Sequence, residues 1–257
     1  MFSKSVYVQR RASLRQKMGQ GIALFLGNEE SPMNYPGNTY RYRQDSSFLY
    51  FFGLSLPHLA GVVDFDSGED ILFGDDVSLE DVIWMGPQPS VKELAFGAGV
   101  EKTKPFDELL NYIQTAIRNG QKIHFLPPYR LLNALFLEDL TGINHKMARL
   151  YSSPDLIKAV VNLRSVKDSH EIEELEKAFA IGYQMHTLAM KMCKPGIYER
   201  EIAGAIEGLA LSHGGTVSFP VILSQNGETL HNHHHGNMLQ EGRLMLTDAG
   251  AETERGY

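Results

Sequence analysis

Cysteine, tryptophan and long apolar runs are almost missing from this sequence of 257 residues. The single Cys193 cannot form an internal disulfide, which favours a reducing compartment, and we expect a cytoplasmic protein. A lone thiol of this kind packs as a small apolar residue more often than it acts as a nucleophile. The basic segment 1–18 has no apolar signal core, and GIALFLG at 21–27 is far too short to cross a bilayer.

Basic side chains are fewer than acidic ones: the chain has 24 Lys and Arg but 31 Asp and Glu, which gives a formal net charge of -7. This charge opposes a general role in binding nucleic acid or an anionic membrane, so we expect neither partner. Apolar residues make up 43% of the chain, enough for one large domain or two smaller ones with separate cores.

Helical and strand patterns alternate through the first 150 residues, which predicts a mixed α/β domain. The expected helices cover 1–18, 107–120 and 130–140, and the expected strands cover 21–27, 46–54 and 122–127. The first helix should turn Val6, Leu14 and Met18 inward. The segment 61–74 has two apolar runs around Gly68, the pattern of a β-hairpin.

The second half begins with stronger helix signals. Ser153 and Pro154 are expected to start one helix, and Asp168 with Glu171 should form a capping box at the start of the next. The inward face of this second helix is predicted to contain Ile172, Leu175, Phe179, Gly182, Met185 and Ala189. A further helix at 200–215 and strands at 216–224 and 243–250 should follow. We divide the chain into domains at 1–163 and 164–257.

Histidines fill four of the five positions from 231 to 235, which raises the question of a metal site. Consecutive side chains point in different directions, although His231, His233 and His235 share a face of an extended segment. We favour a polar loop for the run 233–235. Asp248 ends an apolar strand, where a buried carboxylate is costly unless it is paired or binds a cation. The competing interpretation of Asp248 is a simple turn residue before Ala249 and Gly250.

The order of these features resembles the creatinase/methionine-aminopeptidase superfamily, the "pita-bread" metallopeptidases. The matching segments are a long acid-capped helix, K-P-G at 194–196, F-P-x-I-L-S at 219–224, L-H at 230–231 and L-T-D-A-G-A-E-x-x-x-G-Y at 246–257. The segment 40–53, YRYRQDSSFLYFFG, is similar to the signature of aminopeptidase P N-terminal domains. The resemblance implies an α/β fold, with an aminopeptidase P-like N-terminal domain followed by the first part of an α+β pita-bread catalytic domain.

The resemblance also implies roles for three residues. Enzymes of this kind hold two divalent metal ions, here expected to be Mn²⁺, with two Asp, one His and two Glu; Asp248 matches the first Asp. His231 would face the substrate and assist catalysis, although Asn232 replaces the aromatic residue usual after it. Trp84 would contact the substrate of a neighbouring subunit, whereas a lone tryptophan is by default a core or interface residue.

The implied activity is release of the N-terminal residue from peptides with proline in the second position. The other family ligands come later than Asp248, so we expect the present chain to be inactive, to bind no metal tightly, and to associate with itself through unpaired strands or to lack order after residue 215. The alternatives are an Xaa-Pro dipeptidase (prolidase) and a non-catalytic peptide-binding or oligomerisation module.

Overall fold

The computed structural model describes all 257 residues and contains two compact units, Met1–Val166 and Lys167–Tyr257. The first unit consists of α1 (Lys4–Met18), β1 (Ile22–Leu26), β2 (Pro32–Tyr35), β3 (Asn38–Thr39), α2 (Ser46–Phe52), β4 (Ala60–Asp64), β5 (Asp70–Phe73), α3 (Leu79–Met85), α4 (Val91–Ala98), β6 (Lys102–Lys104), α5 (Glu108–Arg118), β7 (Ile123–His124), α6 (Leu131–Thr141) and α7 (Pro154–Ser165). The second unit consists of α8 (Ser169–Met192), α9 (Glu199–Ser212), β8 (Thr216–Val217), β9 (Ile222–Ser224), β10 (Leu246–Asp248) and β11 (Ala251–Glu252). None of the helices is both long and apolar enough to span a membrane.

A five-stranded sheet in the order β6-β5-β4-β1-β7 forms the centre of the first unit. The predicted hairpin is confirmed as the antiparallel pair β4 and β5, and Gly68 in its turn has the positive φ of 78° that favours glycine. The outer pairs β1–β7 and β5–β6 are parallel. This arrangement confirms the predicted mixed α/β domain.

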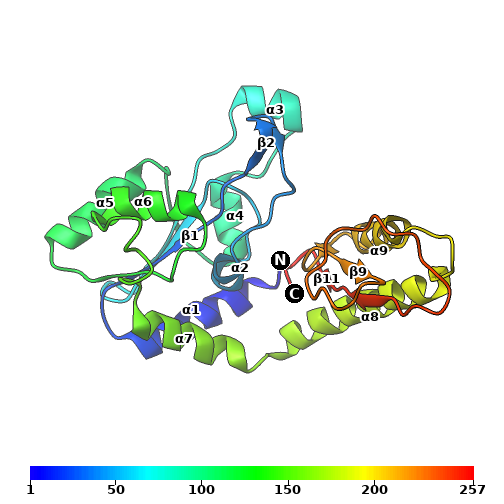
Figure 1. Cartoon of the computed structure of the whole chain (residues 1–257). Coiled ribbons are helices and arrows are strands. Elements are labelled where there is room, and N and C mark those ends of the chain that lie inside the picture. The colour runs from blue at the N-terminus through cyan, green and yellow to red at the C-terminus, as the bar shows by residue number, and fades with distance from the viewer. The chain divides into compact units, whose positions relative to one another are not determined.

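Strand β1, which lies between β4 and β7, contributes to two hydrophobic clusters because its side chains alternate between the faces of the sheet. Ala23 and Phe25 pack into the cluster formed with α1, α2, α4 and α7. Ile22 and Leu24 pack into the cluster formed with α5 and α6. Figure 1 shows α1 and α7, in blue and yellow-green, side by side on one side of this sheet.

The prediction of a strand at 46–54 is wrong, because most of this segment forms α2. The aromatic residues favoured a strand by propensity, but Phe48, Phe51 and Phe52 have helical spacing and all are fully buried. Asp45 caps the helix by accepting hydrogen bonds from the backbone N–H groups of residues 47 and 48, at 2.8 and 2.9 Å. Tertiary packing of the helical face therefore outweighs the β-propensity of the aromatic side chains.

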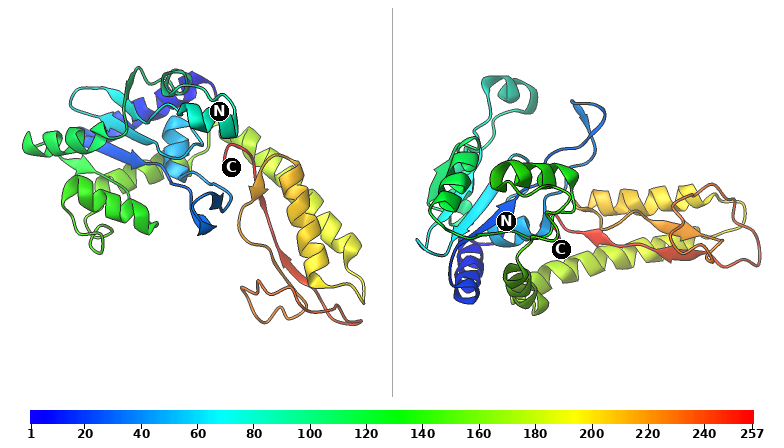
Figure 2. Two further views of the ribbon diagram at one scale, coloured as in Figure 1. Left: turned by 90° about the horizontal axis from the view of Figure 1, so that it is seen from above. Right: turned by 60° about the vertical axis from the view of Figure 1, so that its left-hand side comes forward.

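The second unit places two helices against one side of its strands (Figure 2, left panel). The apolar core between them contains Ile181, Met185, Ile202, Ile206, Val221 and Leu223. The predicted cap of α8 is confirmed, since Asp168 and Glu171 form a capping box. The predicted strand at 216–224 is divided into β8 and β9, and the one at 243–250 is reduced to β10, while β11 follows it outside the predicted range. The pairs β8–β11 and β9–β10 are both antiparallel.

The predicted inward face of α8 is only partly correct. Met185 and Ala189 are buried, but Ile172 and Phe179 are 47% and 65% exposed. Glu171 and Glu174 occupy buried positions instead. Their carboxylates accept hydrogen bonds from Tyr257 Oη at 3.2 Å and Arg255 Nη1 at 2.7 Å, respectively. Because each donor lies more than 80 positions after the glutamate that it contacts, the helical pattern alone could not reveal that these acids are paired.

Candidate functional site

Asp248 lies at the end of β10, where it is the pairing partner of Ile222 in β9. Its side chain is exposed, which contradicts the expectation of a buried strand end. The alternation of the strand explains this position, because Met245 and Ala249 pack toward the helices while Leu246 and Asp248 belong to the opposite face. On that face Leu246 and Asp248 of β10 are exposed, whereas their pairing partners Ser224 and Ile222 of β9 are buried. The Asp248 carboxylate is therefore accessible at an edge of this face.

His231 lies in the loop that joins β9 to β10, and its side chain is also exposed. No hydrogen bond or ion pair links it to Asp248. The other histidines of the run are used locally: His235 Nε2 lies 3.1 Å from the carbonyl oxygen of Val221, and the backbone N–H of His234 donates to Asn232 Oδ1 at 2.9 Å. The loop is therefore held by polar contacts, both among its own residues and with residues outside it such as Val221.

A metal site cannot be assembled from the residues of this chain as they are placed. No group of three or more His, Cys, Asp and Glu side chains is arranged to hold a metal ion. A divalent ion bound by protein alone requires several such ligands, and one carboxylate does not supply them. Asp248 can serve as one ligand of a larger site, but it does not form a site by itself.

Trp84 belongs to α3, a helix of the first unit with no buried residue. The tryptophan is 81% exposed, and Leu79, Ile83 and Met85 around it are 86%, 81% and 60% exposed. A core position is thereby excluded for Trp84. The helix is nevertheless well formed, because Ser78 and Asp81 make a capping box at its start.

Two residues that position the candidate site were missed from the sequence. His186 of α8 places Nε2 3.0 Å from the carbonyl oxygen of Ala249 and thus fixes the turn after Asp248. Glu199, the first residue of α9, is fully buried and contacts both ends of the loop that carries His231. Both residues contact partners far along the chain. In the sequence, His186 is only a histidine on a predicted helix and Glu199 only a glutamate next to the start of one, so neither pattern indicates these contacts.

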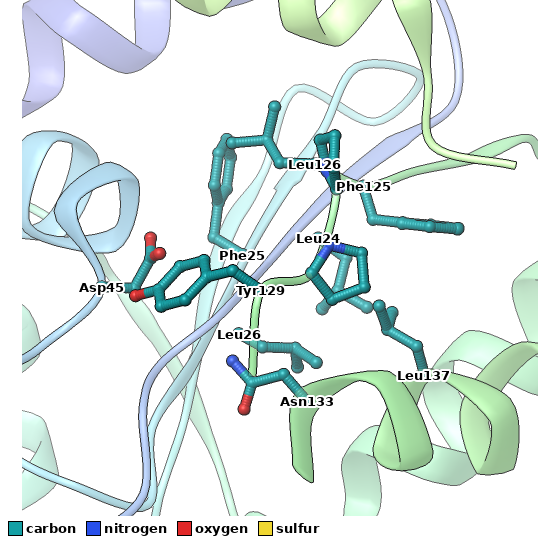
Figure 3. Close-up of a pocket in the computed structure, with 11 residues that line it drawn as sticks. Leu24, Phe25, Leu26, Asp45, Phe125, Leu126, Tyr129, Asn133 and Leu137 are labelled. Carbon is teal, nitrogen blue, oxygen red and sulfur yellow. The ribbon is translucent and has the colours of Figure 1, made fainter. Parts of the chain in front are cut away.

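A pocket in the first unit contains none of the predicted site residues. It has an empty volume of ≈ 430 Å³, part of it open to solvent, and is lined mainly by apolar side chains of β1, the loop after β7, and α6. Figure 3 shows the Tyr129 hydroxyl directed toward the Asp45 carboxylate at one side of this pocket. Burial raises the pKa of Tyr129, while a hydrogen bond from Asn28 opposes the rise. Since Asp45 also caps α2, its carboxylate has a structural role at this position.

Two family models match successive parts of this chain, in the order in which the two units fold. Residues 7–124 match the aminopeptidase P N-terminal domain, and residues 173–257 match metallopeptidase family M24. These matches define the class: an N-terminal α/β domain of the aminopeptidase P type followed by the beginning of a metallopeptidase domain. The two units of the chain are thus similar, in this order, to the two domains of aminopeptidase P-like metallopeptidases.

The individual relatives agree with this assignment. The Xaa-Pro aminopeptidase of Escherichia coli is 27% identical, with 99% of this chain and 60% of that protein covered. A probable Xaa-Pro aminopeptidase of Chaetomium globosum is 28% identical over 90% of this chain and 38% of its own. The human Xaa-Pro dipeptidase is 27% identical over 90% of this chain and 48% of its own. This chain therefore spans between about two fifths and three fifths of the length of these relatives.

Solved structures give the same result. A variant of Escherichia coli aminopeptidase P in complex with substrate superimposes with a TM-score of 0.83 and 26% identity, covering 98% of this chain and 60% of the other. The same enzyme with the inhibitor Pro-Leu gives a TM-score of 0.81, with 97% and 59% covered. The likeness thus extends over both units of the present chain.

Proposed function

We propose that this chain is the N-terminal part of a metal-dependent aminopeptidase that releases the first residue of peptides with proline in the second position. The observation that carries the proposal is the succession of an aminopeptidase P N-terminal domain and the beginning of an M24 domain in one chain. The similarity to aminopeptidase P bound to substrate supports the same activity. Cleavage before proline requires a specialised site, since the proline nitrogen has no N–H and its φ is fixed.

In the whole protein Asp248 would be one ligand of a centre with two divalent ions, which we propose to be Mn²⁺. A structure of the Escherichia coli enzyme has zinc substituted for its metal, which supports a divalent ion at such a site. His231 would lie near the scissile carbonyl and donate a hydrogen bond to the oxygen as negative charge develops there. Because the present residues form no complete metal site, we propose that this chain alone is inactive and binds no metal tightly.

Self-association is proposed as well, through the exposed apolar side chains of α3 and through unpaired strand edges of the second unit. Trp84 would then contact the substrate of a neighbouring subunit. The cytoplasmic location is a proposal that rests on the single cysteine.

An Xaa-Pro dipeptidase is the second candidate function, and the human dipeptidase among the relatives favours it. The two functions differ in the length of peptide accepted. A protein that cleaves Xaa-Pro-Xaa tripeptides is an aminopeptidase, whereas one restricted to Xaa-Pro dipeptides is a dipeptidase.

The test is peptide hydrolysis with added Mn²⁺, comparing this chain with the longer protein that contains it. Hydrolysis of Xaa-Pro peptides by the longer protein only is the expected result. Activity in neither would favour a non-catalytic peptide-binding module. Activity in this chain alone would mean that His231 and Asp248 belong to a complete site, contrary to the proposal.

A further inference from the structure

The carboxylate of Glu199 is the most thoroughly buried acid next to the loop that carries His231. The residue is 0% exposed, and no cation pairs with it. Its Oε1 accepts the backbone N–H of Gln225 at 2.8 Å, and its Oε2 accepts the backbone N–H and the side-chain Nδ2 of Asn237 at 3.3 and 3.0 Å. Burying a carboxylate without a cation is costly, so these donors must offset its lost hydration.

The two partners of Glu199 stand at the two ends of one loop. Gln225 directly follows β9, and Asn237 precedes the buried Leu239 that returns the chain to the core. The backbone of α9 supports the same connection, because the N–H groups of Glu199 and Arg200 donate to the carbonyl oxygens of Asn237 and His235, both at 3.0 Å. A single side chain therefore joins the beginning and the end of the loop 225–237.

The helix alone does not explain this placement. A glutamate in the first turn is favoured by the helix dipole and can cap its own helix, as Glu201 does by accepting the N–H of Tyr198 at 3.0 Å. Glu201 remains exposed in that role. Glu199 instead directs both oxygens away from its own helix and into the loop, which a capping function does not require.

We propose that Glu199 is a positioning residue that holds the loop 225–237 closed and thereby keeps His231 facing the substrate. The inference rests on the proposed role of His231. The loop has few apolar contacts of its own, and residues 231, 233 and 234 are exposed. Its conformation therefore depends on hydrogen bonds. Asn232 Nδ2 of the loop donates to Ser224 Oγ of β9 at 3.1 Å, and Glu199 joins the two ends of the loop. Loss of the connection at Glu199 loosens the segment that carries the imidazole.

The variant Glu199→Gln tests the connection with almost no change in volume. A glutamine offers one acceptor oxygen, and its NH₂ group then faces an N–H donor at one end of the loop. Glu201→Gln is the matched control, since it removes the same charge from the same helix end without touching the loop. In Glu199→Gln the amide hydrogens of residues 225–237 should exchange about tenfold faster or more, and the control should retain wild-type exchange.

A second substitution separates lost contact from general damage. Combining Glu199→Gln with Asn237→Asp exchanges amide and carboxylate across the same contact, and should restore much of the protection of the loop. In the longer protein, Glu199→Gln should lower kcat for an Xaa-Pro peptide about tenfold while KM stays within about twofold, because the role assigned to His231 is in the transition state.

The outcomes distinguish this inference from the proposed function. Unchanged exchange of the loop in Glu199→Gln, or a kcat equal to that of Glu201→Gln, would overturn the role of Glu199. If hydrogen exchange in α9 rose as much as in the loop, and Asn237→Asp did not restore protection, Glu199 would only stabilise the fold. That result would also overturn the proposed positioning role. A longer wild-type protein without Xaa-Pro activity would instead refute the proposed function, whatever the loop does.

Discussion

Replacing Arg11 by methionine should destabilise the first unit strongly, although this arginine lies far from the residues of the candidate site in sequence. Its guanidinium is fully buried and joins four elements. Nε donates to Asp70 Oδ2 at 2.8 Å and Nη1 to the carbonyl oxygen of Phe51 at 2.7 Å. Nη2 donates to the carbonyl oxygens of Ala98 and Gly99 at 3.0 and 2.8 Å. Thus α1 is tied to the ends of α2 and α4 and to β5.

The magnitude follows from what the substitution leaves behind. Methionine fills the space of the arginine stem, but the carbonyls of Phe51 and Ala98 lose a charged donor and the Asp70 carboxylate loses a buried partner. Removing one partner of a buried ion pair lowers the free energy of unfolding by roughly 3–5 kcal/mol, and we expect a loss of about 4 kcal/mol for Arg11→Met. Burial lowers the pKa of Arg11 and the charge of Asp70 opposes that shift, so the ion pair offsets part of the cost of desolvation.

Urea denaturation followed by far-UV circular dichroism measures this loss. With a slope of about 2 kcal/mol per molar urea, the midpoint of the first unit should fall by about 2 M. The fluorescence of Trp84 is a poor probe because its ring is 81% exposed, so hydrogen exchange of α1 should identify which transition belongs to the first unit. Arg15→Met is the control: this arginine also pairs with Asp70 but is 24% exposed, and its removal should cost about 1 kcal/mol or less. A loss below about 1 kcal/mol in Arg11→Met would refute the reasoning.

Three further predictions concern acid stability, association and metal binding. Burial raises the pKa of Glu174, but hydrogen bonds from Lys177 and Thr253 and the charge of Arg255 outweigh it, so the pKa is lowered overall. The carboxylate therefore adds stability above its unfolded pKa that is lost as the pH falls, and the stability difference between wild type and Glu174→Gln should shrink from pH 6 toward about pH 3 in urea titrations; a constant difference would contradict this. Trp84→Ala should leave the unfolding midpoint unchanged and reduce self-association in sedimentation velocity, and unchanged association would remove Trp84 from the interface. Titration of this chain with Mn²⁺ should show no saturable binding at micromolar concentration and no difference in Asp248→Asn, whereas tight binding lost in that variant would reveal a site within this chain.

Features determined by neighbouring residues could be predicted from the sequence. The capping box of Asp168 and Glu171 and the start of α7 at Ser153 and Pro154 involve groups within three positions, and both are confirmed. The hairpin around Gly68 belongs to the same class, because its turn requires a positive φ at one position.

Features determined by distant partners could not be predicted. The buried acids of α8 depend on Arg255 and Tyr257, and Glu199 depends on residues 26 and 38 positions away. The aromatic residues of α2 have helical spacing, but their β-propensity favours a strand, and the sequence does not decide between the two signals. For the candidate site, the sequence indicates Asp248 and His231 by resemblance, whereas the exposure of the Asp248 side chain is visible only in the fold.

Side chains alternate between the faces of β1, β4 and β5, so these three strands together separate the two hydrophobic clusters of the first unit. A substitution that shifts Phe25 on one side must also move the backbone behind Leu24 on the other, because adjacent residues share the same peptide groups. We therefore expect the two clusters to unfold together, and a defect near α1 to be felt at α5 and α6 through the shared strands.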